Sequence, residues 1–135
     1  MILAFDIGNT NIVIGLLEGT KILNSARIAT DKKKTEIDFA IQFQQMLEIF
    51  KVNKDTIEGT IVSSVVPEVT NQIITALKLM LGDKKIVVVG PGIKTGLSIK
   101  IENPQSLGAD RVCDAVCVIE EYKVPAIIID IPFFA

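Results

Sequence analysis

Residues 1–29, MILAFDIGNT NIVIGLLEGT KILNSARIA, carry the pattern that decides the fold. Apolar and β-branched residues fill 2–7, 11–17 and 21–29, and turn-forming residues separate these runs. Such runs bounded by Gly and Asn predict strands joined by tight turns. Because short Gly-containing turns join neighbouring strands antiparallel, we expect a three-stranded meander.

The remaining sequence alternates between helical and strand patterns. Thr35 is a candidate N-cap, Pro67 suits the first turn of a helix and Gly82 suits its end. The periodicity predicts helices over 36–51, 67–81 and 106–122, and strands over 59–66, 85–89, 97–101 and 126–130. A meander followed by alternating helices and strands predicts an α/β domain with a mixed sheet and flanking helices.

Composition excludes several classes of function. Fourteen basic and 16 acidic residues give the 135-residue chain a net charge of −2, which argues against nucleic-acid binding through a positive field. The absence of histidine excludes Ser-His-Asp catalysis and His-based zinc sites. Cys113 and Cys117 are too few for a disulfide framework and suit a reducing cytoplasm. We find no signal peptide or membrane-spanning run, and we expect the Lys32–Lys34 run to be a solvated loop.

The first candidate site is the turn after the first strand, Asp6-Ile7-Gly8-Asn9-Thr10-Asn11. Gly8 allows a ligand to approach the backbone closely, and consecutive turn amides can surround an anion. A carboxylate beside a phosphate is favourable only with a cation between them, so Asp6 would hold Mg²⁺ directly or through water. The alternative is an ordinary hairpin turn that binds nothing.

The second candidate site is Gly108-Ala109-Asp110-Arg111, at the start of the third predicted helix. A helix N-terminus attracts anions. Asp110 could act as a general base for a hydroxyl group, and Arg111 could bind a carboxylate or phosphate with two hydrogen bonds. The alternative is helix capping by Asp110, with Arg111 as its surface ion-pair partner.

These motifs in this order resemble those of type III pantothenate kinases, the family that also contains the Baf accessory factors. The matching residues are an Asp-x-Gly-Asn-Thr loop at Asp6–Thr10 and a later series, Thr95-Gly96, Asn103-Pro104 and Gly108–Arg111. The resemblance extends to Asp130. It implies an actin-like ATPase (ribonuclease H-like) fold and ATP-dependent phosphorylation of pantothenate, the first step of coenzyme A biosynthesis.

The resemblance also implies residue roles. Asp110 would be the catalytic base within the pantothenate-binding segment, and Asp130 would bind a monovalent cation, K⁺ or NH₄⁺. Asp6 would manage the Mg²⁺ that accompanies ATP. ATP would contact Asp6, Ile7, Gly8, Asn9, Thr10, Asn11, Ile12 and Val13, and pantothenate would contact Gly108, Ala109, Asp110 and Arg111. Family members are homodimers, which we expect here too.

Two departures from the family pattern bear on activity. The family continues after the strand aspartate with Gly-Thr, whereas Asp130 is followed by Ile-Pro-Phe-Phe-Ala. We therefore expect an ATPase-like domain over 1–124 and the start of a truncated second domain over 125–135. Ile101 stands where many members have a tyrosine. The alternatives are a non-catalytic binding or regulatory module with the same fold, and another sugar kinase or actin-like ATPase.

Overall fold

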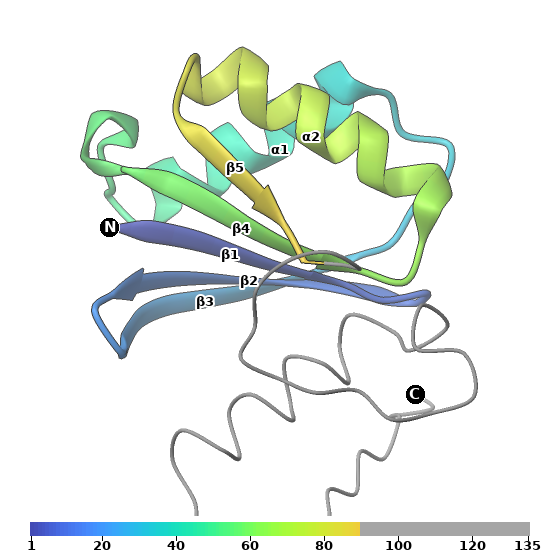
Figure 1. Cartoon of the computed structure of the whole chain (residues 1–135). Helices are drawn as coiled ribbons and strands as arrows, with labels where there is room; N and C mark the ends of the chain where they lie inside the picture. Colours follow the sequence, from blue (N-terminus) through green and yellow to red (C-terminus); the bar gives the residue numbers. More distant parts are fainter. Residues whose placement is uncertain (90–135) are drawn as a thin grey trace, which may run out of the picture. The chain divides into compact units, whose positions relative to one another are not determined.

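The computed structural model describes residues 1–89 of the chain (Figure 1). Its elements, in chain order, are β1 (Ile2–Ile7), β2 (Asn11–Glu18), β3 (Lys21–Ala29), α1 (Glu36–Ile49), the short 3₁₀ helix η1 (Lys54–Thr56), β4 (Gly59–Ser64), α2 (Pro67–Leu81) and β5 (Lys85–Val88). The predicted strands and helices within this range are therefore present. The short η1 was not predicted.

The five strands form one mixed sheet in the order β3-β2-β1-β4-β5. The first three strands pair antiparallel as the predicted meander, while β1–β4 and β4–β5 pair parallel. This arrangement puts β1 at the centre of the sheet, as Figure 1 shows. The carboxyl ends of β1, β4 and β5 consequently share one edge, where ligands of open α/β sheets bind.

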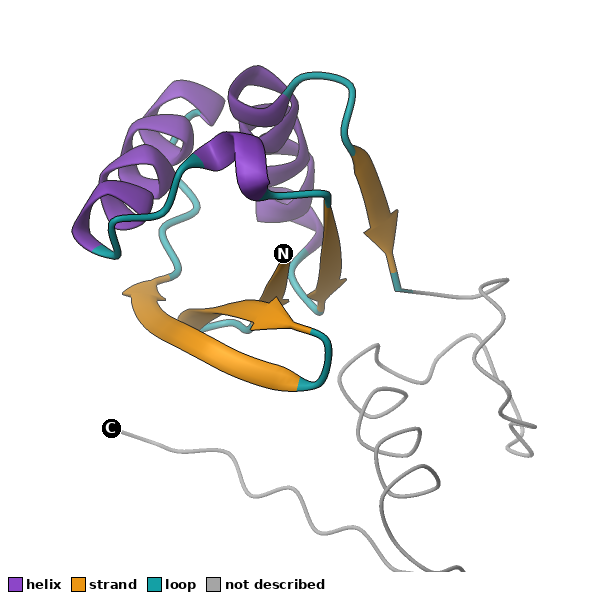
Figure 2. Cartoon of the chain, turned by 90° about the vertical axis from the view of Figure 1, so that its left-hand side faces the viewer, coloured by secondary structure: helices purple, strands orange, loops and turns teal. Residues whose placement is uncertain are grey.

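One face of the sheet carries the hydrophobic core. Alternate residues of β1 (Leu3, Phe5 and Ile7) are almost fully buried, in the same apolar cluster as the inward side chains of α1 and α2. Figure 2 shows both helices on the same side of the sheet. The Phe5 ring meets the edge of Phe43 at 5.0 Å between centroids, and Phe39 stacks on Phe43 at 5.8 Å. Burial of each such side chain stabilises the fold by roughly 1.5–3 kcal/mol.

The first helix begins where predicted and ends earlier. Thr35 and Asp38 form a capping box: the Asp38 N–H donates to Thr35 Oγ1 and the Thr35 N–H donates to Asp38 Oδ2. The predicted end at Lys51 was wrong, because the helix ends at Ile49 and Lys51 takes a left-handed φ of 56°. The N–H of Val52 then bonds to the Leu47 carbonyl, which completes a Schellman-type end.

The fourth strand also ends earlier than predicted. Ser64 closes it, because its Oγ accepts a hydrogen bond from the Val66 N–H at 3.0 Å and another from Thr70 Oγ1 at 2.7 Å. A serine that satisfies backbone groups this way favours a turn over a continued strand. The second helix starts at Pro67, as predicted, and ends before Gly82, whose φ is 67°.

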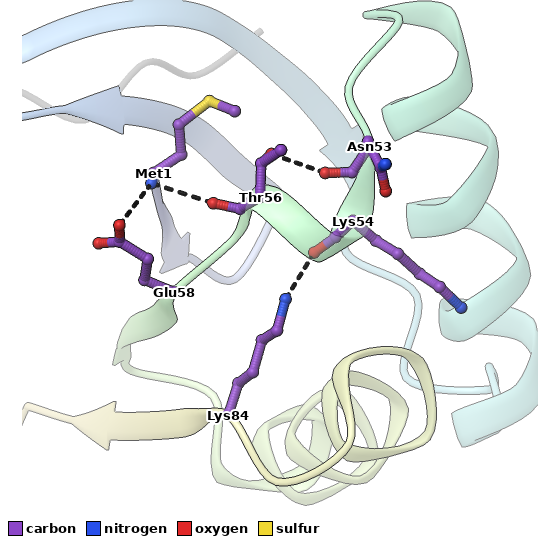
Figure 3. A network of polar contacts seen from close by, with 6 residues as sticks. All are labelled: Met1, Asn53, Lys54, Thr56, Glu58 and Lys84. Carbon is purple, nitrogen blue, oxygen red and sulfur yellow. Dashed lines mark hydrogen bonds and ion pairs between the residues drawn. The ribbon is translucent and has the colours of Figure 1, made fainter.

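A polar network ties down the edge where β1, β4 and β5 begin (Figure 3). The Met1 amine donates to the Thr56 carbonyl at 3.2 Å and lies 3.8 Å from a Glu58 carboxylate oxygen. Lys84 Nζ donates to the Lys54 carbonyl at 2.7 Å. These contacts join η1 to the sheet through the charged groups of Met1, Glu58 and Lys84.

Within residues 1–89, neither helix is long and apolar enough to cross a membrane.

Candidate functional site

The turn between β1 and β2 is closed by its own backbone. The Gly8 N–H donates to the Asn11 carbonyl at 2.9 Å, with Asn9 and Thr10 at the tip. A Cβ atom at Gly8 would lie 3.1 Å from the same Asn11 oxygen, closer than ordinary van der Waals contact. Glycine therefore lets the chain fold back tightly here. The predicted approach of a ligand to the Gly8 backbone stays a prediction.

Thr30, which directly follows β3, supports this turn from the side. Its Oγ1 donates to the Gly8 carbonyl at 2.7 Å, and its N–H donates to the Thr10 carbonyl at 2.9 Å. Thr30 was not predicted to belong to the site. The sequence does show a hydroxyl residue at the end of the third predicted strand. That Thr30 lies beside the turn follows from the β2–β3 register, which pairs Asn11 with Ala29.

The tip of the turn presents groups that can bind an anion. Asn9 and Thr10 are exposed, and their main-chain N–H groups donate to no other group within residues 1–89. Consecutive amides in a turn form a concave site for phosphate-like anions. The amide of Asn9 and the hydroxyl of Thr10 add side-chain donors beside them.

The predicted ATP-binding segment divides into two sets by burial. Ile7 and Ile12 are register partners, and both are fully buried in the core, where they anchor the base of the turn. Asp6 and Val13 are also register partners, and both are exposed on the opposite face. The side chains of the segment that can meet a ligand are therefore those of Asp6, Asn9, Thr10, Asn11 and Val13.

The end of β4 lies beside this turn. The Val65 N–H donates to the Ile7 carbonyl at 3.1 Å, which extends the β1–β4 ladder by one residue. Ser63 pairs with Asp6 across these parallel strands, so the two side chains share one face of the sheet. Ser63 is only 8% exposed, and its Oγ has no hydrogen-bond partner among the described residues. Ser63 was not predicted to belong to the site, because its proximity to Asp6 follows from strand order.

These residues fit a hydrated Mg²⁺ ion. Carboxylate, amide and hydroxyl oxygens are hard donors, and Mg²⁺ in phosphate sites uses one or two carboxylates together with water and phosphate oxygens. No group of three or more His, Cys, Asp or Glu side chains gathers as a metal site in the described residues, 1–89. Asp6 and its register partner Ser63 supply one carboxylate and one hydroxyl on the same face of the sheet, which are donor types that Mg²⁺ accepts.

The basic run after Thr30 is held by local contacts. Lys32 Nζ lies 3.6 Å from Glu68 Oε1. A hydrogen bond from the backbone N–H of Glu68 itself, in the first turn of α2, lowers the pKa of its side chain, and the nearby charge of Lys32 lowers it further. Lys34 Nζ bonds to Gln42 and sits 5.7 Å from the Phe39 ring centroid. Lys32 and Lys33 are exposed, as predicted for a solvated loop, whereas Lys34 is half-buried, so the prediction was wrong for this residue.

The second candidate site lies outside the described residues. This applies to Gly108, Ala109, Asp110 and Arg111, to Asp130 and to Ile101, and to the predicted domain boundary at 124/125. Their roles stay predictions.

Comparison with solved structures identifies the class of fold. The chain is similar to the crystal structure of a protein from Porphyromonas gingivalis that is assigned as an N-acetylglucosamine kinase. The TM-score is 0.51 at 18% sequence identity, over 65% of this chain and 33% of the other. At this identity the likeness shows the fold alone, which is that of the sugar kinases and actin-like ATPases, as the resemblance implied.

Sequence comparison identifies the family. Residues 2–132 match the model of the type III pantothenate kinase family. The chain is also 42% identical over 130 residues to a type III pantothenate kinase from Bifidobacterium animalis subsp. lactis (strain AD011), covering 96% of this chain and 51% of that protein. The chain belongs to the type III pantothenate kinase family. It spans about half the length of this curated relative.

Proposed function

We propose that the chain takes part in the ATP-dependent phosphorylation of pantothenate to 4′-phosphopantothenate, the first step of coenzyme A biosynthesis. The observation that carries this proposal is the Asp6–Thr10 turn, whose tip exposes consecutive amides beside a carboxylate in a chain of this family. Phosphoryl transfer requires positioning and charge neutralisation more than covalent help from the protein.

The Asp6–Val13 segment would hold the nucleotide. The N–H groups of Asn9 and Thr10 would donate to phosphate oxygens, while the Thr30 hydroxyl keeps the Gly8 carbonyl directed away from them. Asp6 would accept hydrogen bonds from the hydration shell of Mg²⁺. When bound, Mg²⁺ neutralises charge on the phosphates.

The Gly108–Arg111 segment would hold pantothenate. Asp110 would remove the proton from the hydroxyl that is phosphorylated, and Arg111 would bind the substrate carboxylate as a planar cation with two donors. Asp130 would bind K⁺ or NH₄⁺. These roles rest on the family motifs, since the residues lie beyond position 89.

We further propose a homodimer in the cytoplasm, in line with the family resemblance. A second candidate function is a binding or regulatory module that binds ATP without turnover. The sequence feature that favours it is the Ile-Pro-Phe-Phe-Ala run after Asp130, where the family has Gly-Thr.

A coupled assay of ADP release tests the proposal. We expect the 135-residue chain to release ADP from ATP in the presence of Mg²⁺ and K⁺ only when pantothenate is added, and Asp110→Asn to abolish this release while retaining the far-UV circular dichroism spectrum. Pantothenate-independent release would contradict the substrate, and undiminished release by Asp110→Asn would contradict the base. ATP binding without any turnover would favour the binding module.

A further inference from the structure

Ser63 is a buried hydroxyl residue that the fold alone does not explain. It is 8% exposed, and its Oγ makes no hydrogen bond within residues 1–89. Leaving a buried hydroxyl unpaired is unfavourable, and such groups are uncommon in proteins. Its neighbour Ser64, by contrast, is fully engaged with Val66 and Thr70 in the turn into α2.

The position of Ser63 suggests what would satisfy it. Ser63 and Asp6 are partners in the parallel β1–β4 register, on the face of the sheet that α1 and α2 leave uncovered. Neighbouring strands lie about 4.8 Å apart, so groups that share one oxygen-rich ligand can sit on adjacent strands at this level. The pair also lies at the carboxyl end of both strands, next to the Gly8 turn.

We infer that Ser63 is a second oxygen partner for the hydrated cation that accompanies the nucleotide, with Asp6 as the first. A hydroxyl can donate to the Asp6 carboxylate and accept from a water molecule at the same time, so it suits a position between a carboxylate and a hydrated Mg²⁺ ion. This inference rests on the proposed function, because it assumes that Asp6 manages the cation of Mg·ATP.

Thr60 provides the matched comparison on the same strand. Its Oγ1 is also buried and has no partner in the described part of the chain, but Thr60 is the register partner of Leu3, on the face that carries the core. Both residues therefore carry the cost of an unpaired hydroxyl, and only Ser63 faces the same side as Asp6. Removing the Thr60 hydroxyl should leave cation binding unchanged.

Isothermal titration calorimetry on the full chain tests the inference, with ATP added as Mg·ATP or with EDTA. We expect Ser63→Ala to weaken Mg·ATP binding about 3–10-fold, the size of one ordinary hydrogen bond. The affinity for ATP without Mg²⁺ should change less than about twofold, which is the smallest effect expected from the loss of one hydrogen bond. Thr60→Val should match the wild type. In an Asp6→Asn background, Ser63→Ala should add no further loss. If Ser63→Ala does not fold, Ser63→Cys takes its place in the same titrations. Its thiol is close in size to the hydroxyl and is a much weaker hydrogen-bonding group.

The outcomes separate this inference from the proposed function. If Asp6→Asn weakens Mg·ATP binding and Ser63→Ala does not, the assignment of Ser63 is wrong and the proposed function stands. Equal weakening with and without Mg²⁺ also overturns it, since it would show a general structural role. If the wild-type chain binds no Mg·ATP, the proposed function fails and the inference fails with it.

Discussion

Thr30 Oγ1 donates a 2.7 Å hydrogen bond to the carbonyl of Gly8, although 22 residues separate them. This contact fixes the outer side of the turn whose inner side is closed by the Gly8 N–H and the Asn11 carbonyl. The geometry of the candidate phosphate site therefore depends on β3 as well as on the motif itself.

Thr30→Val should loosen this turn. The substitution keeps the shape of the side chain and leaves the part-buried Gly8 carbonyl without its hydroxyl partner, which costs about 1 kcal/mol. We expect the urea midpoint to fall and Mg·ATP binding to weaken. Thr20→Val, at the exposed turn between β2 and β3, is the control and should change neither. Unchanged nucleotide affinity in Thr30→Val would contradict the supporting role of this residue.

Lys51→Gly should stabilise the chain. Lys51 is the only non-glycine residue with positive φ within residues 1–89, and it occupies the Schellman position where glycine is preferred. Relief of the left-handed strain, less the added entropy of the unfolded chain, should give about 0.5–1 kcal/mol in urea unfolding. The same change inside α2, Lys78→Gly, should destabilise by about 1 kcal/mol. A loss of stability in Lys51→Gly would contradict the observed helix end.

Thr60→Val should also stabilise the chain. The hydroxyl of Thr60 is buried among core residues and has no hydrogen-bond partner within the region that the structure describes, so an isosteric methyl group removes a desolvation cost of about 1 kcal/mol. Thermal unfolding should then move up by a few degrees. Thr56→Val is the opposite case, because Thr56 Oγ1 donates to the Asn53 carbonyl at 2.7 Å, and it should lower the midpoint. A lower midpoint for Thr60→Val would show that its hydroxyl has a partner.

The capping box of α1 should be visible in a pH titration. Hydrogen bonds from the backbone N–H and the side chain of Thr35 lower the pKa of Asp38. Because the folded-state pKa is depressed, the contribution of Asp38 to stability is present above the ordinary aspartate pKa and is lost as pH falls through the folded value.

NMR titration of the Asp38 carboxyl group checks this assignment. Thr35→Ala should raise its pKa towards the ordinary value, whereas Thr75→Ala, on the exposed side of α2, should leave it unchanged. An Asp38 pKa that does not respond to Thr35→Ala would mean that the capping box is not formed in solution.

Local patterns were sufficient to predict most elements of the described region. The glycine and asparagine turns delimit β1, β2 and β3, and Thr35, Pro67 and Gly82 mark helix ends by well-understood capping chemistry. The end of α1 was mispredicted because a lysine occupies a position that normally requires glycine. The end of β4 was mispredicted because Ser64 satisfies the turn with its side chain.

The candidate site was predictable only where it is contiguous in sequence. The Asp6–Asn11 motif is local, so its residue types revealed its chemistry. Thr30 and Ser63 reach it through the β2–β3 and β1–β4 pairings, and nothing in the local sequence specifies that β4 lies beside β1. Their contribution required the sheet topology.

The most direct test of the account is an NMR titration of the ¹⁵N-labelled chain with Mg·ATP. If the Asp6–Thr10 turn binds the nucleotide phosphates, the largest amide shifts should fall on Gly8–Asn11, with a smaller shift at Ser63. Largest shifts at the opposite end of the strands, around Thr56, Glu58 and Lys84, with an unmoved turn, would contradict it.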